Sequence, residues 1–226
     1  MEREGEPDSM QTAKGLPVHV CGRALNSPRH ICCFFDSNDQ RYEVLRPTFQ
    51  EGLDQGEEVL CITEASFVQE HRARLCAHGI DVAWHENEGQ LRTLTSDETY
   101  LNGGRFDRDR MYGILVDNLK RTRSSSFRGF RGFGDMGWAL KNFPGTDQLM
   151  EYESELNRLL DGHDDTTFIC IYDVNQVSGK AMLDLLSTHS HVVIGTAVTA
   201  NPYYMPPEEY RRAFLAKRAR TSPLAS

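Results

Sequence analysis

The sequence predicts an α/β protein with a mainly parallel sheet and helices on both faces. Short apolar runs of strand length alternate with helical patterns of about 10–15 residues from His30 onward. Several of these runs, such as Thr167–Tyr172, are apolar enough to be buried on both faces, which is typical of parallel sheets. The last two runs leave no room for a helix between them, so the chain is expected to end its sheet with an antiparallel strand hairpin.

Length and composition support one globular domain. The 226 residues are 39% hydrophobic and 26% charged, and no apolar run approaches the roughly 20 residues of a membrane helix. The acidic start, Met1 to Asp8, lacks the apolar core of a secretory signal. Six scattered cysteines without a CxxC pair indicate reduced, buried thiols, so we expect a cytoplasmic protein. The formal charge of −8 argues against direct binding to nucleic acid.

The first half of the chain begins with a segment that has no periodicity. Residues 1–26 mix glycine, proline, serine and charge, and they are expected to form a disordered tail. Apolar spacing, turn residues and glycine stops then predict alternating elements. These are a strand at His30–Phe35, a helix from Tyr42 to Leu53, a strand at Val59–Thr63, a helix at Ser66–His78, and short strands at Val82–His85 and Leu91–Leu94.

The second half continues the alternation up to residue 207. We predict a helix capped by Asp107, a strand within Phe127–Met136, helices at Asp147–Leu160 and Ser178–His189, and strands at Thr167–Tyr172, His191–Ile194 and Ala197–Ala200. The domain thus extends over 27–207. Residues 208–226 form a basic helix or tail that is either solvated or in contact with a partner or an anionic surface.

The first strand-to-helix turn excludes a phosphate-binding loop. Ligands of open α/β sheets lie beyond the carboxyl ends of strands. The turn at 36–40 reads Asp-Ser-Asn-Asp-Gln, with no glycine or lysine to hold a phosphate and with two carboxylates that repel one. The glycine string at 129–134 is more typical of a strand that bends than of a nucleotide site. HExxH and GxSxG motifs are absent from the sequence.

Polar and aromatic residues gather where the predicted strands begin and end. His30, Cys32 and Phe34 share one face of the first strand, and Phe35 lies on the other. A histidine at this place is either a satisfied structural residue or a contact to a ligand or metal. Because His30 and Cys32 alone fall short of the three or four ligands that a metal site needs, we predict no metal ligand.

Two later strand ends carry carboxylates. Asp135, between glycines and followed by Trp138, indicates a pocket floor, with a helix cap and a core tryptophan as the alternative. Tyr172 and Asp173 end the most apolar strand. On the predicted helix between these two strands, Glu151 and Glu155 lie on the same face. They either take part in acid–base chemistry or form a solvated surface. His189 and His191 flank a turn, and the aromatic segment 201–207 forms either a lid or a brace.

The chain resembles the MEDS domain family, the methanogen/methylotroph DcmR-type sensory domain. The resemblance rests on short motifs in a fixed order: HICCFF at 30–35, FQEGL at 49–53, YL at 100–101, GRF at 104–106, GDMGW at 134–138, YE at 152–153, Asn157, Cys170, YD at 172–173, His189 and NPYY at 201–204. It implies a RecA/KaiC-like ATPase fold without its phosphate-binding loop, and a sensor of small, hydrocarbon-derived or one-carbon compounds. Asp135 would then occupy the place of the ATPase's metal-binding acid.

Three functions remain open at this point. The leading expectation is a stand-alone sensory or regulatory domain that binds a small molecule and signals to a separate transcription regulator or kinase, because about 20 residues after the domain leave no room for an output module. The second is an interaction adaptor in a kinase or anti-sigma pathway, with a homodimer left open. The third is an acid–base enzyme using His30, Asp135, Glu151 and His189, which requires at least two of them to converge on one pocket.

The expected site is therefore a ligand site without catalytic residues or a cofactor, and without membrane contact. Its candidate residues are His30, Cys32, Phe34, Phe35, Asp135, Trp138, Glu151, Tyr172, Asp173, His189, Asn201 and Tyr203.

Overall fold

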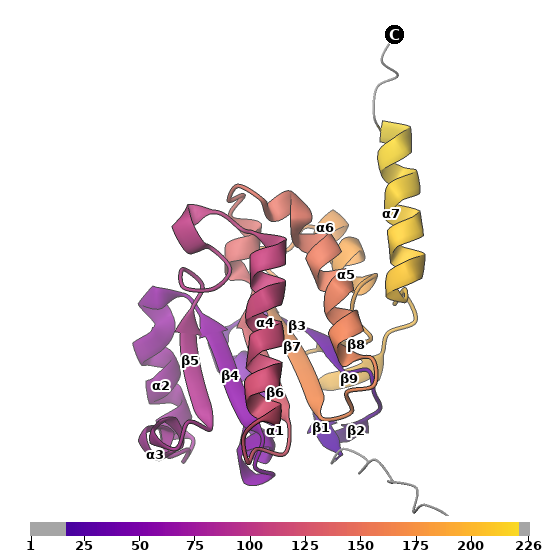
Figure 1. Cartoon of the computed structure of the whole chain (residues 1–226). Helices are drawn as coiled ribbons and strands as arrows, with labels where there is room; N and C mark the ends of the chain where they lie inside the picture. The colour runs from indigo at the N-terminus through magenta and orange to yellow at the C-terminus, as the bar shows by residue number, and fades with distance from the viewer. Residues whose placement is uncertain (1–16, 222–226) are drawn as a thin grey trace, which may run out of the picture.

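A seven-stranded sheet forms the centre of the computed structural model, which describes residues 17–221 (Figure 1). Its strand order is β5-β4-β6-β7-β3-β8-β9, and every neighbouring pair is parallel except β8 with β9. The strands are β3 (His30–Phe35), β4 (Glu58–Thr63), β5 (Leu91–Thr95), β6 (Phe130–Asp135), β7 (Thr166–Asp173), β8 (His191–Ile194) and β9 (Ala197–Ala200). The α/β class, the parallel sheet and the terminal hairpin are confirmed.

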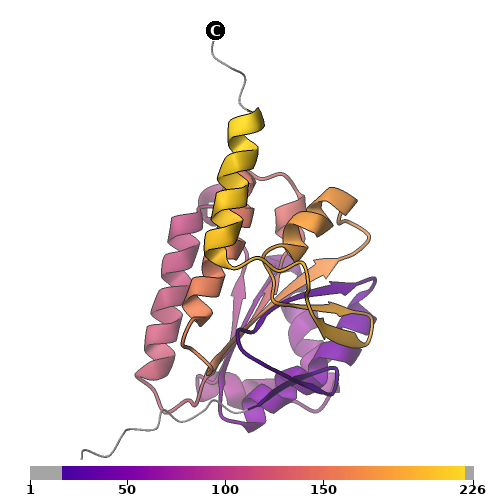
Figure 2. The ribbon, with the colours of Figure 1, turned by 90° about the vertical axis from the view of Figure 1, so that its right-hand side faces the viewer.

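The described part of the chain contains seven α-helices. Two views of the ribbon, related by a rotation of 90°, show helices on both faces of the sheet (Figures 1 and 2). They are α1 (Asn38–Asp54), α2 (Val68–Ala77), α3 (Val82–Asn87), α4 (Arg108–Arg123), α5 (Leu149–Leu160), α6 (Gly179–Leu186) and α7 (Pro207–Thr221). None of the helices within residues 17–221 is long and apolar enough to cross a membrane.

Two hydrophobic cores, one on each face of the sheet, hold the layers together. Cys32 and Phe34 of β3 belong to the core under α4, α5 and α6, whereas Ile31, Cys33 and Phe35 belong to the core under α1, α2 and α3. This division follows from the two-residue period of a strand. All six residues of β3 are buried, as expected for a central parallel strand.

Local capping chemistry sets where the major helices begin. Ser37 accepts a hydrogen bond from the backbone N–H of Gln40 and starts α1, and Asp107 does the same for Arg110 at the start of α4. Gly79 follows α2 in the left-handed region, with φ of 88°, where glycine is favoured. Because β3 to β8 are all parallel, their carboxyl ends share one edge of the sheet.

Two sequence predictions are wrong. Part of the expected disordered tail forms an antiparallel hairpin, β1 (Val18–Val20) with β2 (Arg23–Leu25), because both valines of β1 are buried against α1 and the core. The remaining tail, residues 1–16, lies outside the described residues. The segment Val82–His85 is helical rather than a strand, because Asp81 caps it by accepting from Trp84 N–H at 3.0 Å, and that favours a helical turn.

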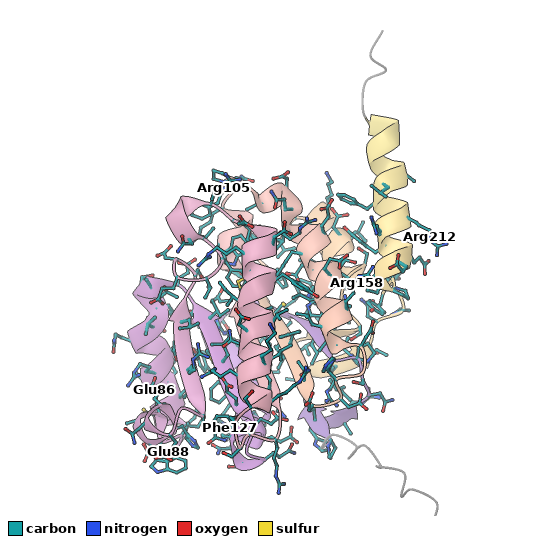
Figure 3. The ribbon with its side chains drawn as sticks, viewed as in Figure 1. Glu86, Glu88, Arg105, Phe127, Arg158 and Arg212 are labelled. Atoms are coloured by element: carbon teal, nitrogen blue, oxygen red, sulfur yellow. The ribbon has the colours of Figure 1, made fainter. Side chains whose placement is uncertain are left out.

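The last helix, α7, extends past the end of the body (Figure 2). It packs against α5, and Arg158 of α5 forms an ion pair with Glu208 in its first turn. Figure 3 shows Arg158 and Arg212 along this side, with Arg105 at the carboxyl end of the sheet and Glu88 and Phe127 at the opposite end. The predicted basic helix at 208–226 is therefore present as far as Thr221.

Candidate functional site

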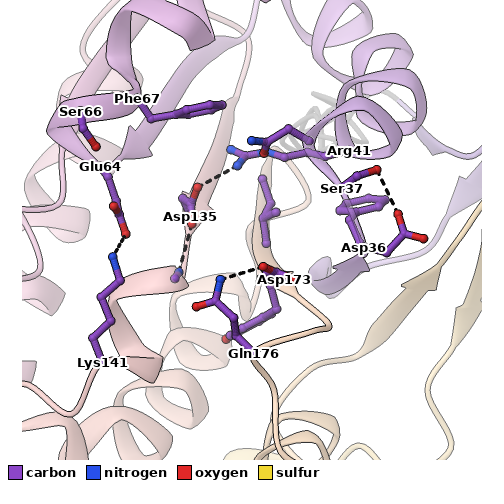
Figure 4. Close-up of a pocket in the computed structure, with 15 residues that line it drawn as sticks. Asp36, Ser37, Arg41, Glu64, Ser66, Phe67, Asp135, Lys141, Asp173 and Gln176 are labelled. Carbon is purple, nitrogen blue, oxygen red and sulfur yellow. Dashed lines mark hydrogen bonds and ion pairs between the residues drawn. The ribbon is translucent and has the colours of Figure 1, made fainter.

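A cavity opens at the carboxyl edge of the sheet, above β3, β4, β6 and β7, and we call it the edge cavity. Its volume is about 440 Å³, within the range of small-molecule sites. Figure 4 shows its charged side chains, which come from α1, from the ends of β6 and β7 and from the segments that follow β3, β4 and β6. It is lined by Phe35, Asp36, Ser37, Asn38, Arg41, Glu64, Ser66, Phe67, Asp135, Gly137, Lys141, Ile171, Tyr172, Asp173 and Gln176.

An ion pair crosses the edge cavity. Arg41 of α1 lies 2.7 Å from Oδ2 of Asp135, at the end of β6, and both side chains are largely buried. The other oxygen, Oδ1, accepts a hydrogen bond from Gly137 N–H at 3.0 Å, which fixes the carboxylate. Lys141 pairs with Glu64 on the far side of Asp135 (Figure 4). The ion pair of Arg41 with Asp135 therefore links α1 to the 3₁₀ segment Gly137–Leu140 that follows β6.

The charge of the edge cavity disfavours phosphate. Its lining carries four carboxylates, those of Asp36, Glu64, Asp135 and Asp173, against two cationic side chains. Burial tends to raise the pKa of Asp173, but hydrogen bonds from the Gln176 amide and from Asn175 outweigh it and lower that pKa, so this carboxyl is ionised at neutral pH. The negative lining and the absence of a phosphate-binding loop from the sequence lead to the same conclusion, that the edge cavity does not favour a phosphate group.

Apolar side chains also line the same cavity. Phe35, Phe67 and Ile171 are among its lining residues, and the Arg41 guanidinium carbon lies 5.9 Å from the Phe67 ring centroid. Apolar side chains combined with a few hydrogen-bonding groups are the usual composition of a site for a small organic molecule.

A second group of polar side chains lies inside the protein, between the sheet and α5. His30 of β3, Glu153 of α5, Cys170 of β7 and His189 after α6 place one ligand atom each within 4.8 Å of one another, and we call them the inner cluster. Glu153 Oε2 lies 3.2 Å from His30 Nε2 and 3.6 Å from His189 Nε2. Cys170 Sγ lies 3.5 Å from His30 Nε2 and 3.8 Å from Glu153 Oε2.

Burial controls the protonation of the inner cluster. It lowers the pKa of His30 to about 4 and that of His189 to about 3, so both imidazoles are neutral at pH 7. It also raises the pKa of the Glu153 carboxyl and of the Cys170 thiol. Fully buried ionisable groups of this kind are costly without a partner, so their grouping calls for an explanation.

Tyr172 connects the two places. Its hydroxyl donates to Glu153 Oε1 at 3.3 Å, and the same residue lines the edge cavity. Its ring stacks on Phe34, with the ring centroids 5.7 Å apart. Tyr172 is therefore a residue of the edge cavity that also contacts the inner cluster.

The candidate residues predicted from the sequence separate into three sets. Phe35, Asp135, Tyr172 and Asp173 line the edge cavity, and ligand binding by them stays a prediction. His30 and His189 meet in the inner cluster, with ring centroids 4.0 Å apart. The remaining candidates, Cys32, Phe34, Trp138, Glu151, Asn201 and Tyr203, lie in neither the edge-cavity lining nor the inner cluster.

Structural roles explain three residues of that last set. Cys32 Sγ lies 3.7 Å from the His191 carbonyl oxygen, and Trp138 packs between Tyr100 and Phe106. Asn201 donates to the His189 carbonyl oxygen at 2.8 Å and so braces the loop that carries this histidine.

Glu151 and Tyr203 lie apart from both groups. Glu151 forms a 2.5 Å ion pair with Arg108 on the surface, and Tyr203 is 67% exposed. Two of the four acid–base candidates, His30 and His189, therefore converge, but they do so in the core and not in the edge cavity, whereas Asp135 and Glu151 lie elsewhere.

Sequence reasoning missed Arg41, Glu153 and Cys170 as site residues. Arg41 lies six residues after the end of the first strand and one helical turn after the Ser37 cap. This place at the start of the first helix, next to the carboxyl edge of the sheet, was the sequence signal that could have identified it. Glu153 sits on an amphipathic helix, where a glutamate is typical of the solvated face. Its complete burial depends on how α5 packs, which the sequence does not specify locally.

Comparisons with known proteins identify the family of the chain. The profile of the family described as MEDS, the methanogen/methylotroph DcmR sensory domain, matches residues 29–190. The chain belongs to the MEDS family. The transcriptional repressor DcmR of Methylorubrum extorquens is 25% identical over 183 residues, which cover 81% of this chain and 65% of that protein. This MEDS chain thus spans just under two thirds of the repressor's length.

The fold has a solved neighbour. A KaiC-like protein from Pyrococcus horikoshii OT3 superposes with a TM-score of 0.53 at 13% identity, covering 72% of this chain and 70% of that one. The expected relation to the KaiC-like fold is confirmed. The family match and the DcmR relative, and not this structural neighbour, support a sensory or regulatory role for the MEDS domain.

Proposed function

We propose that this MEDS domain is a sensor that binds a small organic molecule in the edge cavity and signals to a separate regulatory protein. The observation that carries the proposal is the cavity of about 440 Å³ at the carboxyl edge of the sheet. Ligands of open α/β sheets bind at this edge. The family match supports the sensory part of the proposal.

The lining of the edge cavity defines the ligand by chemical class. Its apolar side chains suit a short hydrocarbon skeleton, and the ion pair of Arg41 with Asp135 offers both a donor and an acceptor. The excess of carboxylates favours a neutral or cationic polar group over a phosphate. We therefore propose a hydrocarbon derivative such as an alcohol, amine or amide, and no catalytic turnover. The volume suits molecules larger than a one-carbon compound.

Signalling follows from the position of the ion pair. A ligand that competes for Arg41 or Asp135 changes the link between α1 and the 3₁₀ segment after β6. Such a ligand shifts the equilibrium between two arrangements by its difference in affinity for them. A transcription regulator or kinase that contacts this edge would respond to the shift.

Thermal unfolding with a panel of compounds tests the proposal. The panel contains short alcohols, amines, amides, halocarbons and nucleotides, and the variants are Asp135→Asn in the cavity and Glu88→Gln at the opposite end of the molecule. We expect one organic class to raise the Tm of the wild type and of Glu88→Gln in a concentration-dependent manner. The rise should disappear in Asp135→Asn, and nucleotides should have no effect.

Two results would contradict the proposal. The first is the absence of any Tm shift across the panel. The second is an equal shift in Asp135→Asn, which would place the ligand outside the edge cavity.

The projecting helix α7 favours a second candidate function, that of an interaction adaptor. It extends beyond the body of the domain (Figure 1), and Leu215 is 53% exposed on it. Its first turn is tied to α5 through Arg158 and Glu208. If α7 is the partner surface, removing residues 208–226 should abolish partner capture while urea unfolding of the domain stays cooperative.

A further inference from the structure

The inner cluster has the donor set of a transition-metal site. Two imidazoles, one carboxylate and one thiol converge from four separate segments of the chain, and all four residues are buried. Imidazole nitrogen and thiolate sulfur are the ligands preferred by zinc and its neighbours in the first transition series, whereas calcium and magnesium prefer oxygen alone.

Four of the six distances between the donor atoms are close to those of a tetrahedron. Bonds of about 2.0–2.1 Å to nitrogen or oxygen and about 2.3 Å to sulfur separate nitrogen from oxygen by about 3.3 Å, and either from sulfur by about 3.6 Å. The two nitrogen–oxygen separations in the inner cluster are 3.2 and 3.6 Å. The separations from Cys170 Sγ are 3.5 Å to His30 Nε2 and 3.8 Å to Glu153 Oε2. The other two, from the His189 donor nitrogen to the donor atoms of His30 and Cys170, are at most 4.8 Å, so the side chains must move inward to surround one ion.

His189 is oriented as a ligand. Its Nδ1 lies 2.8 Å from the Leu185 carbonyl oxygen, which can only accept, so Nδ1 carries the proton. The neutral ring then presents the lone pair of Nε2 to the cluster. That nitrogen has no hydrogen-bond partner, although it is completely buried and lies 3.6 Å from Glu153 Oε2. A ligating histidine usually donates its second ring N–H to a carbonyl in this way.

A hydrogen-bond network accounts for only part of this arrangement. A protonated Glu153 or the Cys170 thiol can donate to His30, but Nε2 of His189 stays without a donor. Tyr172 donates to Glu153 Oε1 and leaves Oε2, the oxygen nearest both histidines, directed into the cluster. A divalent cation satisfies all four donors, and the charges of the thiolate and carboxylate balance it.

We propose that His30, Glu153, Cys170 and His189 bind one divalent transition-metal ion, with zinc as the expected metal. Four protein ligands leave no open position, which is the pattern of a structural zinc site rather than a catalytic one. The ion joins β3, β7, α5 and the turn before β8, and Tyr172 places it beside the edge cavity. This inference does not depend on which ligand the edge cavity binds.

Metal content and cobalt spectroscopy of the full chain test the site. The chain is purified without chelator, and its metal content is measured by inductively coupled plasma mass spectrometry. A second sample is unfolded in the presence of a chelator and refolded with Co²⁺. We expect about one zinc ion per chain. The cobalt form should show a thiolate-to-metal charge-transfer band and the intense visible bands of tetrahedral cobalt. Cys170→Ala should lose both the metal and the band.

Two matched controls separate the inner cluster from other thiols. Cys33→Ala removes an equally buried thiol from the opposite face of β3, and Cys76→Ala removes an exposed one. Both should keep the metal and the charge-transfer band. Tyr172→Phe, which frees one carboxylate oxygen of Glu153, should weaken metal binding about 10-fold without abolishing it.

The outcomes decide the proposal even if Cys170→Ala does not fold, because the wild-type spectrum alone reports a thiolate ligand. Wild-type chain without zinc, and without a charge-transfer band after refolding with cobalt, would overturn the site and leave a hydrogen-bond network. Loss of the band in Cys76→Ala would also overturn it, since the metal would then be adventitious and at the surface.

Discussion

Exchanging Arg41 for methionine and Asp135 for asparagine, singly and together, measures how firmly the two sides of the edge cavity are joined. Methionine keeps an apolar stem of similar length, and asparagine keeps an oxygen that can accept from Gly137 N–H. The free energies of unfolding of the four proteins form a double-mutant cycle, which isolates the interaction between the two side chains from their other contacts.

Burial sets the expected size of this interaction. The two side chains are only 10% and 20% exposed, and their charged atoms are 2.7 Å apart. A hydrogen bond between charged groups that is partly shielded from water contributes about 1.5–3 kcal/mol, so we expect a coupling of about 2 kcal/mol. Arg74 and Asp39 form a matched pair at 2.6 Å, but Asp39 is 87% exposed, and its coupling should stay below about 1 kcal/mol.

Urea unfolding followed by circular dichroism, at low and at high salt, supplies the free energies. The coupling between Arg41 and Asp135 should exceed that between Arg74 and Asp39, and it should fall less when salt is added, because buried pairs are screened less. Equal couplings in the two cycles, or a coupling between Arg41 and Asp135 near zero, would refute the argument that this pair holds the edge cavity together.

Three further predictions concern stability. Burial lowers the pKa of His71 to about 4, so below pH 6.5 the unfolded chain binds a proton at this histidine and the folded protein does not. His71 alone should therefore contribute about 3 kcal/mol to the loss of stability between pH 6.5 and 4, and pH-dependent urea unfolding should show a loss smaller by about that amount in His71→Phe. Arg131, completely buried and 2.6 Å from Glu57, should cost about 3–5 kcal/mol when exchanged for methionine, and a cost below 1 kcal/mol by urea unfolding would contradict this. In Gly134→Ala the new Cβ would lie 2.6 Å from the Tyr100 hydroxyl, and calorimetry should record a loss of about 1–3 kcal/mol; an unchanged Tm would show that the ring moves freely.

Most of the fold was predictable because its signals are local. The hairpin of His191–Ile194 with Ala197–Ala200 has the bounds that the sequence predicted, since apolar runs and a short turn define both strands. Val82–His85 was misassigned because valine and tryptophan favour strands, while the Asp81 cap that makes the segment helical was overlooked. The hairpin before residue 26 was missed because its two short strands gain their stability from packing on α1.

The site was predictable only where a strand end defines it. Asp135 and Asp173 were placed at the carboxyl edge because strand ends in a parallel sheet share that edge. The inner cluster was not, because His30, Glu153 and Cys170 are far apart in the chain. They meet only through the register of β3 with β7 and the packing of α5, and neither leaves a local pattern in the sequence.

The central claim, that the edge cavity binds a small organic molecule, is tested most directly by native mass spectrometry of freshly purified protein. Spectra are recorded before and after denaturation, with and without the panel of alcohols, amines, amides and halocarbons. We predict an organic mass that is released on denaturation and is absent from Asp135→Asn, separate from any metal mass. A spectrum that shows only the unliganded chain under all these conditions would contradict the account.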